Sequence, residues 1–280
     1  MIVDVHSHMA DSTLHLSDEF KSDLDASWKD HTIHAPPEVH RQEAVADVDA
    51  VIVFPLNAPY SGIVVPNEYV ADYVRGAGEN VIGFASVDAN DVDAPDQLEH
   101  AVKQLGLRGL KIGPIYQGYD PLSAGALAMF AKAEALSTPV MWHHGTTFVR
   151  KAPLRFAQPW QVDEVAIRFP DLKIIVAHMG HPGVGETVSV VRKQPNVFTD
   201  ISGLYPRPWQ YYNALMTAVE YGATHKLLFG TDFPLFSAAD TMAGLRNVNA
   251  LVEGTALPRV PEDVIEGIIH RESLALLGLE

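Results

Sequence analysis

The sequence predicts an α/β protein whose eight strands form a (β/α)8, TIM-like barrel. Eight short runs of aliphatic and β-branched residues recur along the chain, and their interiors are continuously apolar, as in parallel strands covered on both faces. Segments with helical spacing separate most of these runs. A length of 280 residues suits one barrel of this kind. A doubly wound open sheet is the alternative, but no Gly-x-Gly-x-x-Gly turn follows the first run.

The expected elements follow one another in chain order. The strands are residues 2–8, 50–56, 81–87, 107–112, 139–143, 172–178, 196–201 and 226–230. The helices are residues 66–77, 96–104, 122–136, 162–169, 185–193, 208–221 and 241–251. Because strands joined through a helix run parallel, all eight are expected to end at the same side of the barrel. We therefore assign residues 1–280 to one domain, without an internal repeat or a linker.

The connection between the first and second strands is unusually long. It spans about residues 10–48 and carries His15, His31, His34 and His40. Long connections inside a barrel are often functional lids. These four histidines bear no fixed relation to a strand end, so we expect a partly helical surface insertion with solvated histidines.

Composition and charge restrict the classes of function. The formal net charge of −15 disfavours nucleic acid or an anionic membrane as a partner. The chain has no cysteine, so any metal must be held by nitrogen and oxygen, and any nucleophile must be something other than sulfur. No run approaches the ~20 apolar residues of a membrane span, and no secretion signal opens the chain. The expectation is a cytoplasmic protein.

Polar residues terminate four of the expected strands. His6 and His8 lie at i and i+2 in the first strand, so both side chains face the same way. The fifth strand ends at His143, the sixth ends at His178, and Asp232 follows the eighth. Catalytic groups of a barrel gather where its strands end. Each of these residues alone is more often structural, but four strands that end in this way indicate a metal site.

These motifs together resemble the amidohydrolase superfamily. The resemblance rests on Asp-Val-His-Ser-His at residues 4–8, Pro-Val-Met-Trp-His-His-Gly at 139–145, Ala-His-Met-Gly at 177–180 and Gly-Thr-Asp-Phe-Pro at 230–234. It covers essentially the whole chain and is strongest with the amidohydrolase-related branch that includes aminocarboxymuconate semialdehyde decarboxylase-like enzymes. The resemblance implies a TIM-like barrel that holds a divalent metal, commonly Zn2+, with Mn2+ as the second expectation.

The roles of the site residues follow from the same resemblance. It implies that His6, His8, His143 and Asp232 bind the metal, and that His178 is a catalytic histidine or a ligand of a second metal. A metal in such a site activates water, whose proton Asp232 can accept and later pass to the leaving group. His178 can polarise a substrate oxygen or carry a proton.

Two further residues bear on the ligand set. His144 is expected to be a neighbour of the metal site, because the family places its ligand directly after the strand. Lys111 lies near the end of the fourth strand, where some amidohydrolases carry a carbamylated lysine that bridges two metals. Against a bridge, the related decarboxylases typically hold one metal, and a plain amine or a structural ion pair is an ordinary alternative.

Aromatic and arginine side chains lie in the loops that follow the strands. Arg207 and Trp209 follow the seventh strand closely, and Tyr116 and Arg150 follow the fourth and fifth. Arginine pairs with carboxylates through two hydrogen bonds, so these residues are candidates for binding a planar or carboxylated organic substrate. Any one of them could instead simply cover the barrel rim.

Three functions are compatible with this sequence. The first is a metal-dependent hydrolase that acts on an ester, lactone or amide of a small organic acid. The second is a metal-dependent, non-oxidative decarboxylase of an aromatic or muconate-like acid. The third is a catalytically silent binding protein, which is disfavoured because every ligand position of the family that can be placed is occupied. Barrels of this kind often self-associate, so a homo-oligomer is compatible with the sequence as well.

Overall fold

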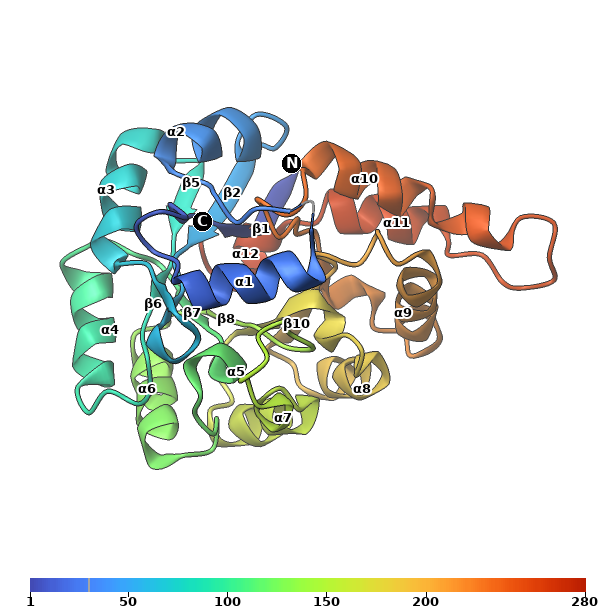
Figure 1. Cartoon of the computed structure of the whole chain (residues 1–280). Coiled ribbons are helices and arrows are strands. Elements are labelled where there is room, and N and C mark those ends of the chain that lie inside the picture. Colours follow the sequence, from blue (N-terminus) through green and yellow to red (C-terminus); the bar gives the residue numbers. More distant parts are fainter. Residues whose placement is uncertain (30) are drawn as a thin grey trace.

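Eight parallel strand positions lie at the centre of the molecule, and helices cover them from outside (Figure 1). The computed structural model describes residues 1–29 and 31–280. The strands are β1 (Val3–His8), β2 (Ala50–Phe54), β5 (Val81–Gly83) with β6 (Ala85–Ser86), β7 (Leu110–Ile112), β8 (Val140–Trp142), β9 (Ile174–Val176), β10 (Val197–Asp200) and β11 (Leu227–Leu228). Every expected strand is therefore present, and each is shorter than its apolar run.

Backbone hydrogen bonds close these strands into a ring. The ladders run in the order β1-β2-β5 and β6-β7-β8-β9-β10-β11. β5 and β6 are two parts of one strand, and between them the N–H of Phe84 donates to the carbonyl of Val53 at 2.9 Å. At the other end, the N–H of Val5 in β1 donates to the carbonyl of Phe229, directly after β11, at 3.0 Å. An open sheet would leave β1 and β11 as free edges, so the predicted barrel is confirmed.

Helices pack against the outer face of the barrel. They are α3 (Asn67–Ala77), α4 (Ala94–Lys103), α6 (Ala124–Ala135), α7 (Pro159–Arg168), α8 (Val184–Lys193), α9 (Pro208–Glu220), α10 (Ala238–Arg246) and α11 (Glu262–Ile269). Shorter elements are α1 (Asp18–Ser27), α2 (Pro37–Val39), α5 (Pro114–Gln117), α12 (Ser273–Leu277) and the antiparallel pair β3 (Asn57–Ala58) and β4 (Ile63–Val64). The sequence interpretation did not include α11, α12 or this hairpin.

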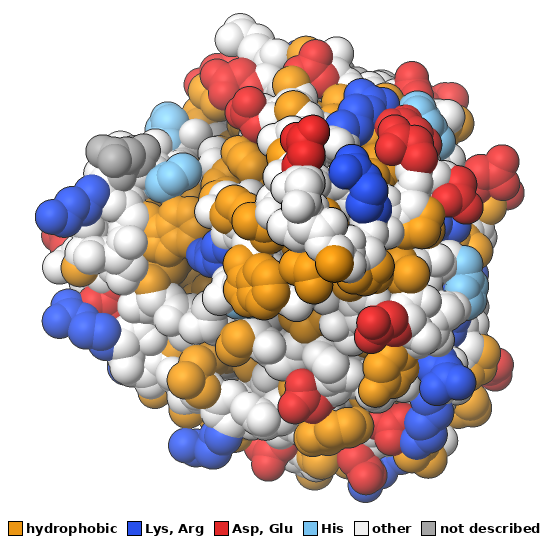
Figure 2. Space-filling model, turned by 90° about the vertical axis from the view of Figure 1, so that its right-hand side faces the viewer, with side chains coloured by type: hydrophobic (Ala, Val, Ile, Leu, Met, Phe, Trp, Pro, Cys, Tyr) orange, Lys and Arg blue, Asp and Glu red, His pale blue; other side chains and the backbone are white. Residues whose placement is uncertain are grey.

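Surface charge is mixed on the face shown in Figure 2, where acidic and basic side chains are interspersed with apolar ones. The whole chain carries 35 Asp and Glu against 20 Lys and Arg, so the excess is acidic. Over residues 1–29 and 31–280, no helix combines the length and the apolar composition that crossing a membrane requires.

Strand register decides which side chains point into the barrel. The ladder between β7 and β8 aligns Lys111 with Met141, so both point to the same face. His143 follows Met141 by two residues and keeps that inward direction. Trp142 points outward and stacks on Phe130 of α6, with ring centroids 5.3 Å apart. The alternation of side chains along β8 therefore sends His143 into the barrel mouth.

The insertion after β1 departs from the expectation at His40. This side chain is fully buried. Its Nε2 lies 2.8 Å from Ser7 Oγ, and its Nδ1 lies 2.9 Å from the hydroxyl of Tyr73 on α3. The prediction of a solvated histidine is therefore wrong here, because Ser7 faces outward from β1 and the insertion packs onto it. The other three, at positions 15, 31 and 34, are partly buried.

Replacing His40 with alanine is expected to destabilise the fold. The change leaves the Ser7 and Tyr73 hydroxyls buried without this partner, and each buried unsatisfied group costs about 1–3 kcal/mol. We expect the free energy of unfolding, measured with urea, to fall by about 3 kcal/mol. The control is His225→Ala at an exposed position, whose free energy of unfolding should stay within about 0.5 kcal/mol of that of the original chain. Equal stabilities of the two variants would show that the buried imidazole contributes nothing.

Candidate metal centre

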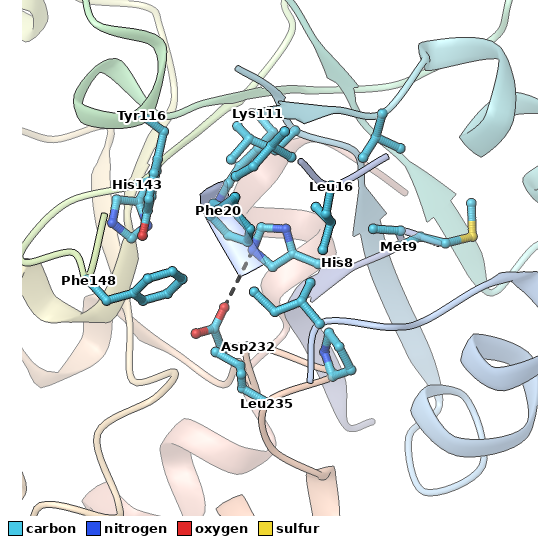
Figure 3. A pocket seen from close by; sticks show the side chains of 16 residues that line it. His8, Met9, Leu16, Phe20, Lys111, Tyr116, His143, Phe148, Asp232 and Leu235 are labelled. Atoms are coloured by element: carbon cyan, nitrogen blue, oxygen red, sulfur yellow. Dashed lines mark ion pairs between the residues drawn. The ribbon is translucent and has the colours of Figure 1, made fainter. Parts of the chain in front are cut away.

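Three side chains converge at one point where β1 ends. The Nε2 atoms of His6 and His8 lie 3.4 Å apart. Asp232 Oδ1 lies 3.3 Å from the first of these nitrogens and 3.5 Å from the second. Ligands about 2.0–2.1 Å from a tetrahedral ion are about 3.3–3.4 Å from one another. The three atoms therefore have the spacing of ligands that share one ion; Figure 3 shows His8 and Asp232 facing each other.

His143 and His178 lie next to this group. Their Nδ1 and Nε2 atoms, respectively, are 3.3 Å apart. The ring of His178 is 4.7 Å from that of His6, measured between centroids. One donor atom each from His6, His178 and Asp232 lies within 4.8 Å of the others. The structure thus brings all five strand-end residues together, from β1, β8, β9 and the segment after β11.

The end of the eighth strand is fixed to β1 by an outer layer of hydrogen bonds. Asp4 accepts from the Thr231 hydroxyl at 2.7 Å and from the Thr231 N–H at 3.0 Å. The N–H of Asp232 donates to the carbonyl of His6 at 2.9 Å. Asp232 has φ +70°, in the left-handed region that costs a residue with a side chain of order 1 kcal/mol. These bonds hold the carboxylate in that conformation, toward the imidazoles.

Hydrogen-bond partners decide which imidazole nitrogens carry lone pairs. His6 Nδ1 lies 2.9 Å from Asp200 Oδ2, and a carboxylate only accepts, so Nδ1 carries the hydrogen and Nε2 holds a lone pair when the ring is neutral. His178 Nδ1 lies 3.2 Å from the carbonyl oxygen of Ser202, which also only accepts. The same argument leaves Nε2 of His178 unprotonated when the ring is neutral.

The donor set fits a cation. His143 Nε2 reaches the carbonyl of Thr146 at 3.4 Å, which leaves its Nδ1 lone pair facing that of His178. Two facing lone pairs beside the Asp232 carboxylate form a set of acceptors that a bound cation would satisfy. Imidazole nitrogens with a carboxylate oxygen suit zinc and manganese. Lys111 Nζ lies 3.3 Å from His6 Nε2, so a cationic side chain also reaches this point.

Burial sets the charge of these groups. It lowers the pKa of His8 to about 3 and that of His178 to about 4, so both rings are neutral at pH 7. Burial also raises the pKa of Asp232, but the neighbouring His178, His6 and His8 outweigh it and hold that pKa well below its usual range. Burial lowers the pKa of the Lys111 amine to about 8. Neutral imidazoles and an ionised carboxylate are the forms that bind metal.

Two residues of this site, at the end of β10, were missed by the sequence interpretation. Asp200 bonds to His6 Nδ1, and its other oxygen accepts from the N–H of His178 at 2.9 Å and from the Ser202 hydroxyl. Ser202 Oγ lies 2.7 Å from His178 Nδ1. A signal was present, because Asp200 ends an expected strand, as do the residues that were chosen. The pair connects a ligand candidate to the candidate catalytic histidine.

Asp200→Asn is expected to weaken metal binding. The carboxylate orients His6 and makes its ring a better donor, and removing such a partner typically costs 10- to 100-fold in metal affinity. We expect a loss in this range for zinc, measured by competition with a chromogenic chelator. Asp171→Asn, at an exposed position, serves as the control and should bind zinc like the original chain. Unchanged affinity in Asp200→Asn would mean that this hydrogen bond does not support the site.

Two compartments open from the centre. The first is lined mainly by apolar side chains (Figure 3). The second is lined by more polar groups, among them Thr146, Thr147 and Arg207. Both are lined by His143 and Asp232, so the candidate metal centre lies where they meet.

The insertion covers both compartments. α1 passes across the front of the strands in Figure 1. Leu16 and Phe20 contribute to the first compartment, and Trp28 contributes to the second. The interpretation as a surface insertion is therefore incomplete, since its apolar side chains face the site.

The candidate substrate residues divide into two groups. Tyr116 lines both compartments, and Arg207 lines the second. The structure does not bring Trp209 and Arg150 to the site. Trp209 is 58% exposed, because α9 begins at Pro208 and turns it outward. The Arg150 side chain is 76% exposed and pairs through Nε with Asp23 Oδ1 of α1 at 2.6 Å, so it anchors the insertion instead.

A family model described as Amidohydrolase matches residues 3–279. The chain belongs to this amidohydrolase family. The predicted resemblance is thereby confirmed, and the family is one of enzymes. No curated protein sequence matches this amidohydrolase.

Solved structures share the fold of this amidohydrolase over its full length. An uncharacterised TIM-barrel protein from Bordetella bronchiseptica has a TM-score of 0.73 at 19% identity, with 99% of this chain and 98% of that chain covered. A probable 2-pyrone-4,6-dicarboxylic acid hydrolase from Acinetobacter baumannii, with citric acid bound, has a TM-score of 0.65 at 14% identity, with 99% of each chain covered. A dihydroxybenzoic acid decarboxylase from Polaromonas, with manganese and 2-nitroresorcinol bound, has a TM-score of 0.62 at 18% identity, covering 99% and 97%.

Proposed function

We propose that this amidohydrolase is a metal-dependent hydrolase of an ester, lactone or amide bond in a small organic acid. The spacing of His6 Nε2, His8 Nε2 and Asp232 Oδ1, at 3.3–3.5 Å from one another, is the observation that supports it. His143 is the fourth ligand in this proposal. Zinc is the first choice of metal because three imidazoles with a carboxylate suit it, and manganese is the second.

Each residue has a role that its surroundings support. A divalent ion, when bound, lowers the pKa of water and polarises a carbonyl oxygen. Asp232 is ionised and its side chain is 15% exposed, so it can accept a proton from the attacking water and pass it to the leaving group. His178 presents an unprotonated Nε2 and can shuttle a proton at the substrate oxygen. Arg207 binds a substrate carboxylate in the second compartment.

A two-metal arrangement is the second form of this proposal. His178 and Lys111 would then hold the further ion, with Lys111 carbamylated at Nζ; its position 3.3 Å from His6 Nε2 supports this form. Elemental analysis gives the number of metal ions per chain. The mass of the intact protein shows whether one CO2 has been added to it.

Decarboxylation is the alternative reaction, and the first compartment favours it. A carboxylate held at the mouth of an apolar space loses its hydration, which destabilises it relative to a transition state in which its charge is spread. The same metal and the same histidines would orient the acid. Hydrolysis and decarboxylation differ in whether water is consumed.

Solvent oxygen therefore separates the two reactions. The zinc- or manganese-loaded protein is incubated in H2-18O with a panel of lactones, aryl esters and aromatic acids. Hydrolysis places one labelled oxygen in the acid product, whereas decarboxylation releases carbon dioxide and a product without solvent oxygen. We expect a labelled acid product, as hydrolysis requires. Release of carbon dioxide with an unlabelled product would instead show that the reaction is decarboxylation. Metal-loaded protein that converts none of these compounds would contradict both.

A further inference from the structure

We propose that the substrate is a monocarboxylate with an apolar arm, which fills the first compartment while Arg207 holds the single carboxylate in the second. This inference rests on the proposed function, because it places the reacting bond at the metal centre. It goes further in naming what each end of the substrate carries.

The wall of the first compartment is apolar away from the metal. Six of its side chains come from the insertion and from the segment that includes the β3–β4 hairpin: Leu16, Phe20, Ile33, Leu56, Ile63 and Val65. Its charged groups, Lys111 and Asp232, lie at the metal end, where both reach His6. A charge on the far part of a substrate would lose its hydration there without gaining a partner, which is costly. This compartment therefore selects an uncharged, apolar arm.

Strand alternation and one backbone bridge build that wall. Ile63 and Val65 line the compartment, whereas Val64 between them points away and is 47% exposed. Leu16 pairs with Ile63 through an isolated antiparallel bridge. The insertion and the hairpin thus form one surface over the first compartment, which gives the arm a preformed site.

The second compartment offers one guanidinium. Arg207 Nη1 donates to the carbonyl of Gly203 at 2.7 Å, and its Cζ lies 5.1 Å from the centre of the Trp28 ring. These contacts fix the guanidinium while leaving it without a carboxylate partner among the ion pairs of the described residues. A fixed arginine of this kind binds one carboxylate through two hydrogen bonds.

The two compartments adjoin at the reacting centre. Tyr116, Phe148 and Leu235 line both compartments, as do the ligand candidates His143 and Asp232. A molecule with its carboxylate at Arg207 and its arm among the apolar side chains must cross between them. Its cleavable bond then lies beside the metal ligands.

Binding of non-reacting acids tests this arrangement without measuring turnover. The zinc-loaded full chain is titrated by calorimetry with linear monocarboxylates from propanoate to octanoate and with dicarboxylates of the same lengths. Each added methylene should tighten monocarboxylate binding about three- to fourfold, as expected for burial of one CH2 group. Each dicarboxylate should bind at least about tenfold more weakly than its monocarboxylate. Affinity that does not depend on chain length, or equal binding of both series, would overturn the proposal.

Variants assign the two ends of the ligand. Ile33→Lys places a cation in the first compartment at a partly buried position, and should remove the length dependence while favouring dicarboxylates. Val64→Lys, whose side chain points away, is the matched control and should behave like the original chain. Arg207→Gln should weaken all monocarboxylates by a similar factor, about tenfold or more. Octanoate binding that is unchanged in Ile33→Lys, or in Arg207→Gln, would count against the assignment; thermal unfolding checks that each variant is folded.

Failure of this proposal can be distinguished from failure of the proposed function. If the length dependence is found but the zinc-loaded protein turns over no ester, lactone, amide or acid, the compartments are assigned correctly and the enzymatic proposal is wrong. If turnover is found but affinity is independent of chain length, the reaction stands and the substrate class is wrong. The wild-type titration decides the substrate class even where a variant does not fold.

Discussion

Asp232→Asn is expected to remove nearly all turnover and to weaken zinc binding. The carboxylate is the one anionic ligand of the proposed set, and its oxygen lies 3.3 Å and 3.5 Å from the two imidazole nitrogens of β1. Asparagine keeps the size of the side chain but removes the negative charge and the ability to accept a proton. We expect turnover to fall by about 10³-fold or more, and zinc affinity by at least about 10²-fold.

Two measurements separate these effects. Zinc affinity is measured by chelator competition, and turnover is measured at zinc concentrations that saturate the variant. Asp240→Asn at the exposed start of α10 is the matched control, and it should match the original chain in both. If Asp232→Asn kept its full rate at saturating zinc, Asp232 would be neither an essential ligand nor a proton carrier. The proposal for the reaction would then fail at its central residue.

His178→Gln is expected to lose turnover while it keeps the metal. Its Nδ1 is held by Ser202, its Nε2 faces the centre, and the three atoms with the tetrahedral spacing belong to other residues. General acid–base catalysis by a placed histidine is worth about 10²- to 10⁴-fold. We therefore expect turnover to fall in that range with an unchanged zinc content of one ion per chain.

The metal content of His178→Gln distinguishes the one-metal form of the site from the two-metal form. In the two-metal form of the site, His178 holds the further ion, and the variant would lose one ion of two. His100→Gln, at an exposed position on α4, is the control and should change neither quantity. A variant with undiminished turnover would remove His178 from the mechanism in either form.

The strands and the five strand-end residues could be anticipated because they depend on local patterns. Continuous apolar runs predict buried parallel strands, and a period of two predicts that His6 and His8 point the same way. Parallel strands around a barrel end at one mouth, so the sequence predicts His143, His178 and Asp232 there. The same criterion applied to β10 would have found Asp200.

Non-local packing decided the rest. His40 lies far from any strand end in the sequence, and only the packing of the insertion against β1 and α3 buries it between Ser7 and Tyr73. Arg150 and Arg207 look alike in the sequence, but Asp23 on α1 draws the first away from the site.

The sequence by itself determined the barrel, the family and the residues at its mouth, because strand period and strand order fix them. The tertiary structure decided which arginine lines a compartment at the candidate metal centre, how the imidazoles are oriented and what covers the pocket. Those features depend on contacts between segments that are distant in the chain, and the spacing of residues along one segment does not predict such contacts.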